Sequence, residues 1–220
     1  MGLFSRRLIK PELLDHAEPQ EARLNLEDLV RINRKFGGHS VLRRTLAHVI
    51  KPDEVFNLLD IGAASGDTAR LIQELFPLGS ITSLDYSPIN LRDAPHPKLI
   101  GDAFALPFSP ESFDYVFCSL FLHHFTDREV IRLLSTFYSA ARRALLVTDL
   151  ERHVFPYWFL PATKLLFAWQ RITVHDGPAS VRASFRPREL LKLATIAQIP
   201  EAQIKVHRPA FRISLVAVKN

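Results

Sequence analysis

The sequence predicts an α/β fold, a seven-stranded, mostly parallel sheet with helices on both faces, preceded by an N-terminal helical cap. Three observations favour it. Strand-like apolar runs alternate with amphipathic segments from Val55 onward, which is typical of a doubly wound parallel sheet. A glycine-containing turn joins the first strand to the first of these helices. Residues 11–50 have helical periodicity without a strand pattern, and 220 residues is the length of one domain.

The predicted cap comprises residues 1–52, and the main domain comprises residues 53–220. Asn25 could cap a first helix, which Gly37-Gly38 would end. A second helix is indicated by apolar residues at helical spacing from Leu42, and Pro52 would close it. The cap could cover a bound ligand, or it could simply pack on the edge of the sheet.

The turn after the first strand has the chemistry of a ligand-binding turn. Asp60 ends the strand, and Gly62, Ala63, Ala64 and Gly66 follow. Glycine lets bare backbone approach a ligand, and the free N–H groups of a helix start can hold a negative group. The spacing differs from the G-x-G-x-x-G of dinucleotide folds. A carboxylate before the turn would repel a pyrophosphate and would suit an ammonium group.

Two further carboxylates follow the next two predicted strands. Asp85 comes after residues 80–84, and Asp102 comes shortly after residues 98–100. In open α/β sheets, ligands bind at the carboxyl ends of the strands. We therefore expect Asp60, Asp85 and Asp102 to gather there, with Asp85 placed to accept hydrogen bonds from two ribose hydroxyls.

These segments resemble the motifs of class I S-adenosylmethionine-dependent methyltransferases, close to the type 11/12 domains. The first motif of that family reads acid-x-Gly-x-Gly-x-Gly, which Asp60, Gly62 and Gly66 match, with Ala64 at the middle glycine. Residues 101–108 resemble the family's Gly-Asp-Ala-x-x-Leu-Pro-Phe segment. The resemblance covers roughly residues 55–218. It implies a Rossmann-like fold, and S-adenosylmethionine as the cofactor of the domain formed by residues 53–220.

The resemblance also implies a cofactor site, in which the three carboxylates hold the amino-acid end, the sugar and the base in turn. Phe104 or Leu106 could pack on the face of the adenine ring. The full set of expected cofactor-binding residues is Asp60, Gly62, Ala63, Ala64, Gly66, Asp85, Tyr86, Asp102, Ala103, Phe104 and Ser119.

Two neighbouring histidines are candidates for acid–base catalysis. His123 and His124 leave the carboxyl end of the fourth predicted strand, residues 112–119. A neutral imidazole there could remove a proton from a methyl acceptor. The alternative is that one of the rings only hydrogen-bonds to backbone.

The segment after the fifth predicted strand is expected to bind the acceptor. Residues 154–169 are aromatic-rich, include Trp158, and are expected to be helical after Pro161. Residues 174–185 are expected to form a polar loop, which resembles the His-Asp-Gly-Pro-x-Ser-Val-Arg loop of a bacterial subgroup linked to polyketide- or quinone-like metabolism. The candidate acceptor-binding residues are Trp158, His175, Asp176 and Arg182, and His175 is also a candidate base. Alternatively, Asp176-Gly177-Pro178 is only a turn and Arg182 only a structural clamp.

The predicted function is S-adenosylmethionine-dependent methyl transfer to a small, apolar or aromatic acceptor. One alternative is a catalytically inactive module that binds the cofactor; another is a nucleotide-linked oxidoreductase. The net charge of +5 is scattered, which does not indicate a nucleic-acid partner. A single cysteine excludes a cysteine-rich metal site, and no metal is expected. We expect a cytoplasmic protein, since no secretory signal is seen. If the acceptor is a prenylated quinone, residues 155–169 could contact a membrane surface. The oligomeric state stays open.

Overall fold

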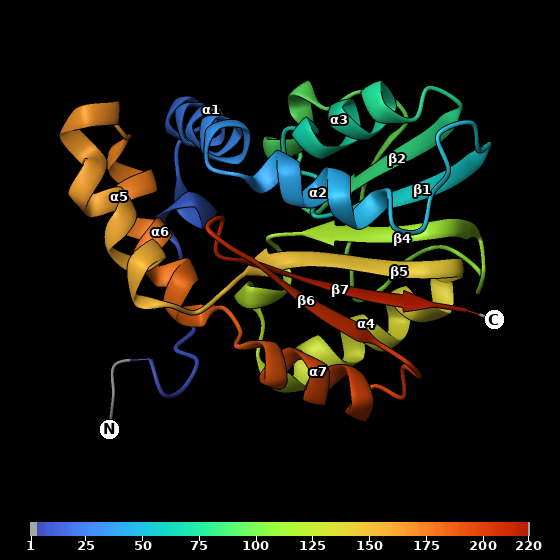
Figure 1. Cartoon of the computed structure of the whole chain (residues 1–220). Helices are drawn as coiled ribbons and strands as arrows, with labels where there is room; N and C mark the ends of the chain where they lie inside the picture. Colours follow the sequence, from blue (N-terminus) through green and yellow to red (C-terminus); the bar gives the residue numbers. More distant parts are fainter. Residues whose placement is uncertain (1–3, 220) are drawn as a thin grey trace.

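The computed structural model describes residues 4–219 and confirms the predicted α/β fold. The seven strands lie in the order β3-β2-β1-β4-β5-β7-β6 (Figure 1). The first five are parallel, whereas β7 runs antiparallel to both β5 and β6. The strands are β1 (Phe56–Ile61), β2 (Gly79–Asp85), β3 (Lys98–Ile100), β4 (Phe113–Ser119), β5 (Ala141–Leu150), β6 (Gln203–His207) and β7 (Arg212–Val218).

The helices divide into two pairs that cover the sheet and three that lie across its carboxyl edge (Figure 1). One face is covered by α2 (Gly38–Leu46) and α3 (Asp67–Leu75), and the other by α4 (Asp127–Ala140) and α7 (Pro187–Ile196). The helices at the edge are α1 (Pro19–Lys35), α5 (Val154–Phe167) and α6 (Arg171–Ala183), and the short 3-10 helices are η1 (Leu13–His16), η2 (Asn90–Asp93) and η3 (Leu122–His124).

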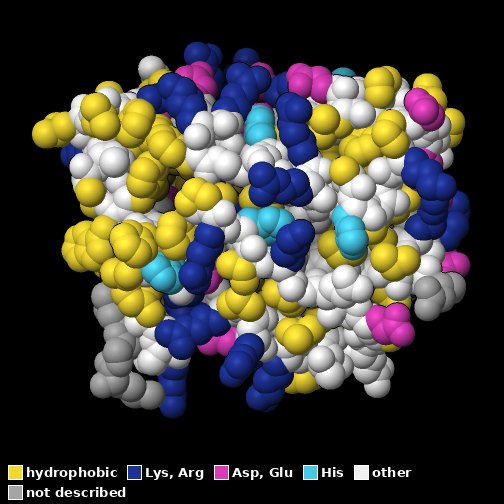
Figure 2. Space-filling view, viewed as in Figure 1, with side chains coloured by type: hydrophobic (Ala, Val, Ile, Leu, Met, Phe, Trp, Pro, Cys, Tyr) yellow, Lys and Arg dark blue, Asp and Glu magenta, His cyan; other side chains and the backbone are white. Residues whose placement is uncertain are grey.

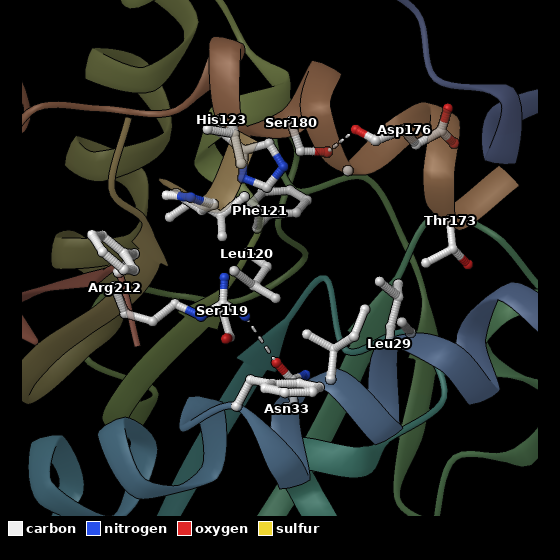
Figure 3. Close-up of a pocket in the computed structure, with 18 of the residues that line it drawn as sticks. Leu29, Asn33, Ser119, Leu120, Phe121, His123, Thr173, Asp176, Ser180 and Arg212 are labelled. Atoms are coloured by element: carbon white, nitrogen blue, oxygen red, sulfur yellow. Dashed lines mark hydrogen bonds between the residues drawn. The ribbon is translucent and has the colours of Figure 1, made fainter. Parts of the chain in front are cut away.

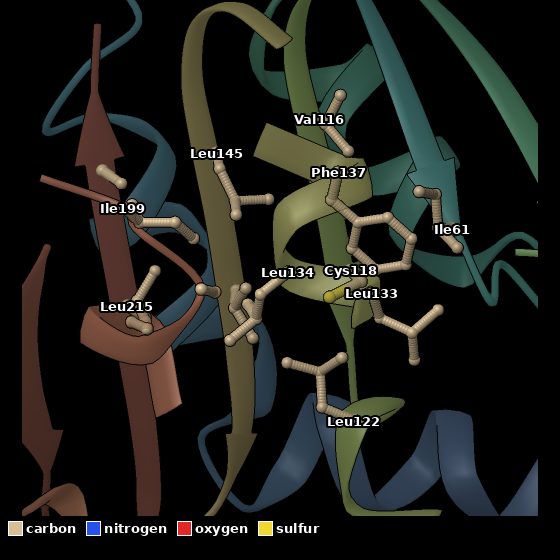
Figure 4. Packing of buried hydrophobic residues seen from close by; sticks show 14 of the residues in the cluster. Ile61, Val116, Cys118, Leu122, Leu133, Leu134, Phe137, Leu145, Ile199 and Leu215 are labelled. Atoms are coloured by element: carbon tan, nitrogen blue, oxygen red, sulfur yellow. The ribbon is translucent and has the colours of Figure 1, made fainter. Parts of the chain in front are cut away.

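Two apolar layers stabilise the sheet, one on each face. The larger layer joins the sheet to α4 and α7, and includes Cys118 and Phe137, both fully buried (Figure 4). Burial of such side chains contributes about 1.5–3 kcal/mol each. A capping box starts α4, with Thr126 and Glu129 each satisfying a backbone N–H of the other. These layers fix the carboxyl ends of the strands, where the cavity described below is found.

The predicted cap plays two different roles. Helix α2 belongs to the apolar layer that also contains α3 and the sheet, whereas α1 lies at the carboxyl edge against α6 and η1. The domain boundary at residue 52 stays a prediction. The proposed N-cap at Asn25 is wrong, because α1 already begins at Pro19. Asn25 is buried inside the helix, where its Nδ2 donates to Thr173 Oγ1 at 2.9 Å.

The segment predicted as a polar loop is a helix. Residues 171–183 form α6 with Gly177 and Pro178 in its interior, and α5 begins at Val154, ahead of Pro161 rather than after it. Close packing of the two helices explains the glycine, since a Cβ at position 177 would lie 2.2 Å from Leu160 Cδ1. Tertiary contact here overrides the local helix-breaking tendency of glycine. No helix within residues 4–219 combines the length and the apolar character needed to cross a membrane.

Candidate functional site

A cavity of about 1310 Å³ opens at the carboxyl edge of the sheet (Figure 3). Its floor is formed by the turn after β1 and by the ends of β2 and β4, and its walls include α1, α5 and α6. Pockets for small molecules usually measure about 300–1000 Å³. The cavity is therefore large enough to hold a nucleoside-sized molecule together with a second, small one.

The turn between β1 and α3 presents backbone to this cavity. Gly62, Ala63 and Ala64 all line it. Gly62 adopts φ +71°, and a Cβ at this position would lie 2.4 Å from Cδ2 of Phe121. Only glycine combines this conformation with so close an approach. Gly66, which precedes the first residue of α3, does not belong to the lining.

Asp85, at the end of β2, holds the turn in place and also lines the cavity. Its Oδ2 accepts from the N–H of Ala64 at 2.9 Å, and its Oδ1 accepts from the N–H of Ser87 at 2.9 Å. Burial raises the pKa of Asp85, although these backbone donors oppose the shift. A carboxylate in this position has lone pairs left to accept hydrogen bonds from a ligand.

Asp60 lies beneath the turn, next to the lining but outside it. Its side chain belongs to a residue that is only 1% exposed, and its Oδ2 has no hydrogen-bond partner among the described residues. Burial, followed by the charges of Asp85 and Asp67, raises the pKa of Asp60 well above its ordinary value. An orphaned carboxylate oxygen costs folding free energy, and a cationic group at the turn would relieve this cost.

The third predicted carboxylate lies at the same edge but outside the cavity lining. Asp102 follows β3, which neighbours β2; the residue is exposed, and its Oδ1 accepts from the N–H of Phe104 at 2.8 Å. Tyr86, Ala103 and Phe104 also lie outside the lining, and Ser119 lies within it. The structure thus brings Asp60 and Asp85 together at the turn and leaves Asp102 on the adjoining surface.

The two candidate histidines lie side by side on η3, with ring centroids 4.2 Å apart. His123 is buried, and its Nδ1 lies 2.6 Å from Oδ1 of Asp149. The carboxylate can only accept, so Nδ1 carries the proton and Nε2 is the free ring nitrogen. Burial alone would lower the pKa of His123, but the charge and hydrogen bond of Asp149 outweigh burial and raise it.

His124 has the opposite electrostatic character. It lines the cavity beside His123. Desolvation, followed by the charge of His123, lowers the pKa of His124 to about 3. At neutral pH this ring is therefore uncharged.

Three side chains at this end of the cavity could also hold a divalent cation. Glu12, His123 and His124 each offer one ligand atom, and these atoms lie within 4.8 Å of one another. Imidazole and carboxylate groups are the ligands that zinc takes in such sites. The same groups have hydrogen-bond partners in the protein: Ser180 Oγ donates to Glu12, and His123 pairs with Asp149. Glu12 and His123 are thus engaged within the protein without a cation.

Of the predicted acceptor-binding residues, only Asp176 lines the cavity. Its two carboxylate oxygens accept from the N–H groups of Leu13 and Leu14 at 2.9 and 3.0 Å, so Asp176 fixes η1 against α6. The other three lie outside the lining: His175, Trp158 and Arg182. The side chain of His175 is 56% exposed, and so is Trp158 as a whole residue. The structure places these three away from the cavity.

Several residues at or next to the cavity were missed in the sequence analysis. Asp149 holds His123 from outside the lining, and it carried a usable signal, since it lies near the carboxyl end of β5 on the same sheet edge as the other carboxylates. Glu12, Asn33 and Arg212 carried none, because they come from segments far apart in the chain and meet only in the folded structure.

Comparisons with known proteins point to methyltransferases. Residues 59–143 match a family model described as a methyltransferase domain. The demethylmenaquinone methyltransferase of Thermotoga maritima is 31% identical over 106 residues, which is 46% of each chain. The chain thus spans less than half the length of this relative.

Solved structures share the fold at low identity. The plantazolicin methyltransferase BpumL, in complex with a pentazolic desmethylPZN analogue and SAH, has a TM-score of 0.67 at 14% identity, covering 92% of each chain. A SAM-dependent methyltransferase from Aquifex aeolicus has a TM-score of 0.61 at 14% identity, covering 92% of this chain and 98% of its own. A putative O-methyltransferase from Nostoc punctiforme has a TM-score of 0.61 at 17% identity, and 60% of its chain is covered. The fold is therefore the Rossmann-like fold of class I methyltransferases.

Proposed function

We propose that this protein is an S-adenosylmethionine-dependent methyltransferase that acts on a small, apolar or aromatic acceptor. The observation that carries the proposal is the glycine turn at the cavity, with Asp85 in the lining and Asp60 beneath the turn, where Oδ2 of Asp60 has no hydrogen-bond partner among the described residues. This arrangement has a place for a cation, a sugar diol and bare backbone contact, which fits the cofactor. The methyltransferase match over residues 59–143 supports the same assignment.

The residues at the turn would divide the cofactor among them. Backbone at Gly62–Ala64 would pass alongside its amino-acid end, and Asp85 would accept hydrogen bonds from its ribose hydroxyls. Asp60 would compensate the ammonium group from beneath the turn. Asp102 follows β3, which neighbours β2, and it would bind the adenine edge, as the sequence predicts.

The rest of the cavity would bind and orient the acceptor. S-adenosylmethionine supplies an activated methyl carbon, so the protein needs chiefly to align the acceptor and exclude water. Where the acceptor is a phenol or enol, Nε2 of His123 would take its proton, and Asp149 would stabilise the resulting imidazolium. The demethylmenaquinone methyltransferase relative and the apolar side chains of α1 and α5 support a quinone-like acceptor.

Transfer of a labelled methyl group to a panel of phenols and quinones tests this function. We expect label in at least one of these products. Binding of the cofactor without transfer to any phenol or quinone of the panel would favour the catalytically inactive module instead.

Replacing Asp60 with asparagine is expected to raise the melting temperature at neutral pH and to weaken binding of S-adenosylhomocysteine. The folded-state pKa of Asp60 lies above its unfolded value of 3.8. Protonated Asp60 buries no charge, so protonation stabilises the folded state. This contribution to the free energy of unfolding is fully present below about pH 3.8 and is lost as pH rises through the folded-state pKa. The difference in melting temperature between mutant and wild type should grow with pH over this range. A melting temperature that falls at neutral pH in the mutant would contradict the assignment.

Contact with a membrane surface is a second prediction, and it arises from α5. One side of this helix lines the cavity with Phe155, Phe159 and Leu160, while Leu165 and Leu166 are 95% and 77% exposed. Figure 2 shows hydrophobic side chains gathered on the side where Figure 1 places α5, with Lys and Arg side chains nearby. An apolar face with basic neighbours binds anionic lipid surfaces.

Substituting both Leu165 and Leu166 with glutamate is therefore expected to reduce co-sedimentation with phosphatidylglycerol vesicles. Leu78→Glu is the matched control, because Leu78 is also exposed but lies between α3 and β2. Equal sedimentation of the wild type and the double mutant would show that α5 does not mediate membrane contact.

A further inference from the structure

Arg212, the first residue of β7, is a buried cation at the cavity that the mechanism above does not use. The residue is only 7% exposed, and it lines the cavity beside Ser119 and Asn33 (Figure 3). Among the described residues, its guanidinium has one hydrogen bond, from Nη2 to Asn33 Oδ1 at 3.2 Å. A guanidinium has five N–H donors, so most of them are left for a ligand.

No carboxylate of the described residues forms an ion pair with Arg212. Asp149 attracts it, but the carboxylate of Asp149 already accepts from His123 Nδ1 and from the N–H groups of His123 and Leu150. Burial lowers the pKa of Arg212 to about 10, and Asp149 offsets this only in part. At neutral pH the side chain remains a cation without a hydrogen-bonded anion.

Two other arginines near the same edge, Arg208 and Arg152, are paired. Arg208 lines the cavity, and its Nη2 and Nε lie 2.6 and 3.2 Å from the carboxylate oxygens of Glu151. Arg152, which is buried to a similar degree, donates to Glu189 and to two backbone carbonyls. A buried charge without such partners destabilises a protein. The unpaired guanidinium of Arg212 therefore indicates that a bound ligand supplies the anionic group that pairs with it.

We propose that Arg212 and Asn33 form a carboxylate-binding subsite of the cavity. The planar guanidinium can donate two parallel hydrogen bonds to a carboxylate, and the Asn33 amide, which already accepts from Arg212, can donate a further one. The inference rests on the proposed function, because that function supplies two sources of a carboxylate: the amino-acid end of the cofactor, and an acidic acceptor. Both have the same chemistry at this subsite.

Calorimetric titration of the wild type and Arg212→Met with three probes tests the subsite and separates the sources. S-adenosylhomocysteine carries the amino acid, 5′-methylthioadenosine lacks it, and benzoate represents an acidic aromatic acceptor. If the cofactor is the source, we expect Arg212→Met to weaken S-adenosylhomocysteine binding by about 10- to 100-fold, a typical loss for a charge-assisted hydrogen bond, and to leave 5′-methylthioadenosine unchanged. If the acceptor is the source, only benzoate binding should weaken.

Arg208→Met is the matched control, since it removes the same charge from the same cavity at a guanidinium that is already paired. An equal loss of affinity for the carboxylate probes in both variants would show that only the overall positive potential of the cavity matters. That result would overturn the subsite. Unchanged affinities in Arg212→Met, or no binding of either carboxylate probe to the wild type, would also overturn it. Failure of the proposed function has a different signature, namely no binding of 5′-methylthioadenosine to the wild type.

The melting temperature separates a binding role from a structural one. Removing an uncompensated buried charge should leave the melting temperature of Arg212→Met unchanged or higher. A clear decrease, together with unchanged probe affinities, would assign Arg212 a structural role only. Arg212→Lys should recover part of the affinity, because lysine keeps the charge but loses the bidentate geometry.

Discussion

Replacing His123 with glutamine is expected to lower kcat/KM for methyl transfer to a phenolic acceptor by a factor of about 10² to 10⁴, the usual contribution of a general base. His123 is the ring that Asp149 orients at 2.6 Å, with Nε2 left free. His48→Gln, at an exposed position beyond α2, is the matched control. If His175→Gln loses activity and His123→Gln does not, the base is the exposed histidine of α6 instead.

The pH profile provides an independent check of this role. His123 must be unprotonated to act, so kcat/KM should fall on the acid side as pH drops through its pKa, which lies above the ordinary value of 6.5. Asp149→Asn removes the charge that raises this pKa, and the acid limb should move to lower pH. The other charged or titratable groups that act on His123 are Glu12, Arg212 and His124, and Arg7 donates to its backbone carbonyl. An acid limb at the same pH in wild type and Asp149→Asn would contradict the assignment.

Replacing Asp85 with alanine is expected to weaken S-adenosylhomocysteine binding by about 10²-fold or more, since two hydrogen bonds to a carboxylate contribute about 1.5–3 kcal/mol each. The same change removes the acceptors for the N–H groups of Ala64 and Ser87, so the turn itself loses support. The measurement is a calorimetric dissociation constant. Asp93→Ala, at an exposed carboxylate on η2, removes the same charge nearby and should bind normally. Equal affinity in Asp85→Ala and wild type would exclude the ribose role.

The sheet could be predicted because its information is local. Each parallel strand is a short apolar run, and β3 begins and ends at the predicted residues. The helices of the carboxyl edge could not be predicted equally well. Gly177 and Pro178 indicate a turn when read locally, but contact with Leu160 on α5 requires a small residue within a continuous helix.

The two halves of the cavity differ in the same way. The half at the turn follows from chain order, since Asp60 and Asp85 end adjacent parallel strands and must meet at one edge. The acceptor half is lined by Glu12, Asn33 and Arg212 from three separate segments, and Asp149 on a fourth segment holds His123 there. The residues next to them in the sequence show no pattern that predicts that these side chains come together in the folded structure. His175, Trp158 and Arg182 were predicted from local composition, and the structure places them outside the cavity.

A calorimetric titration of the wild-type protein with S-adenosylhomocysteine tests the central claim most directly, namely that the turn beside Asp60 and Asp85 holds a sulfonium nucleoside. The account predicts saturable binding with one molecule per chain, and no heat of binding with NADH under the same conditions. Absence of S-adenosylhomocysteine binding, or tighter binding of NADH, would contradict it and would favour the nucleotide-linked oxidoreductase.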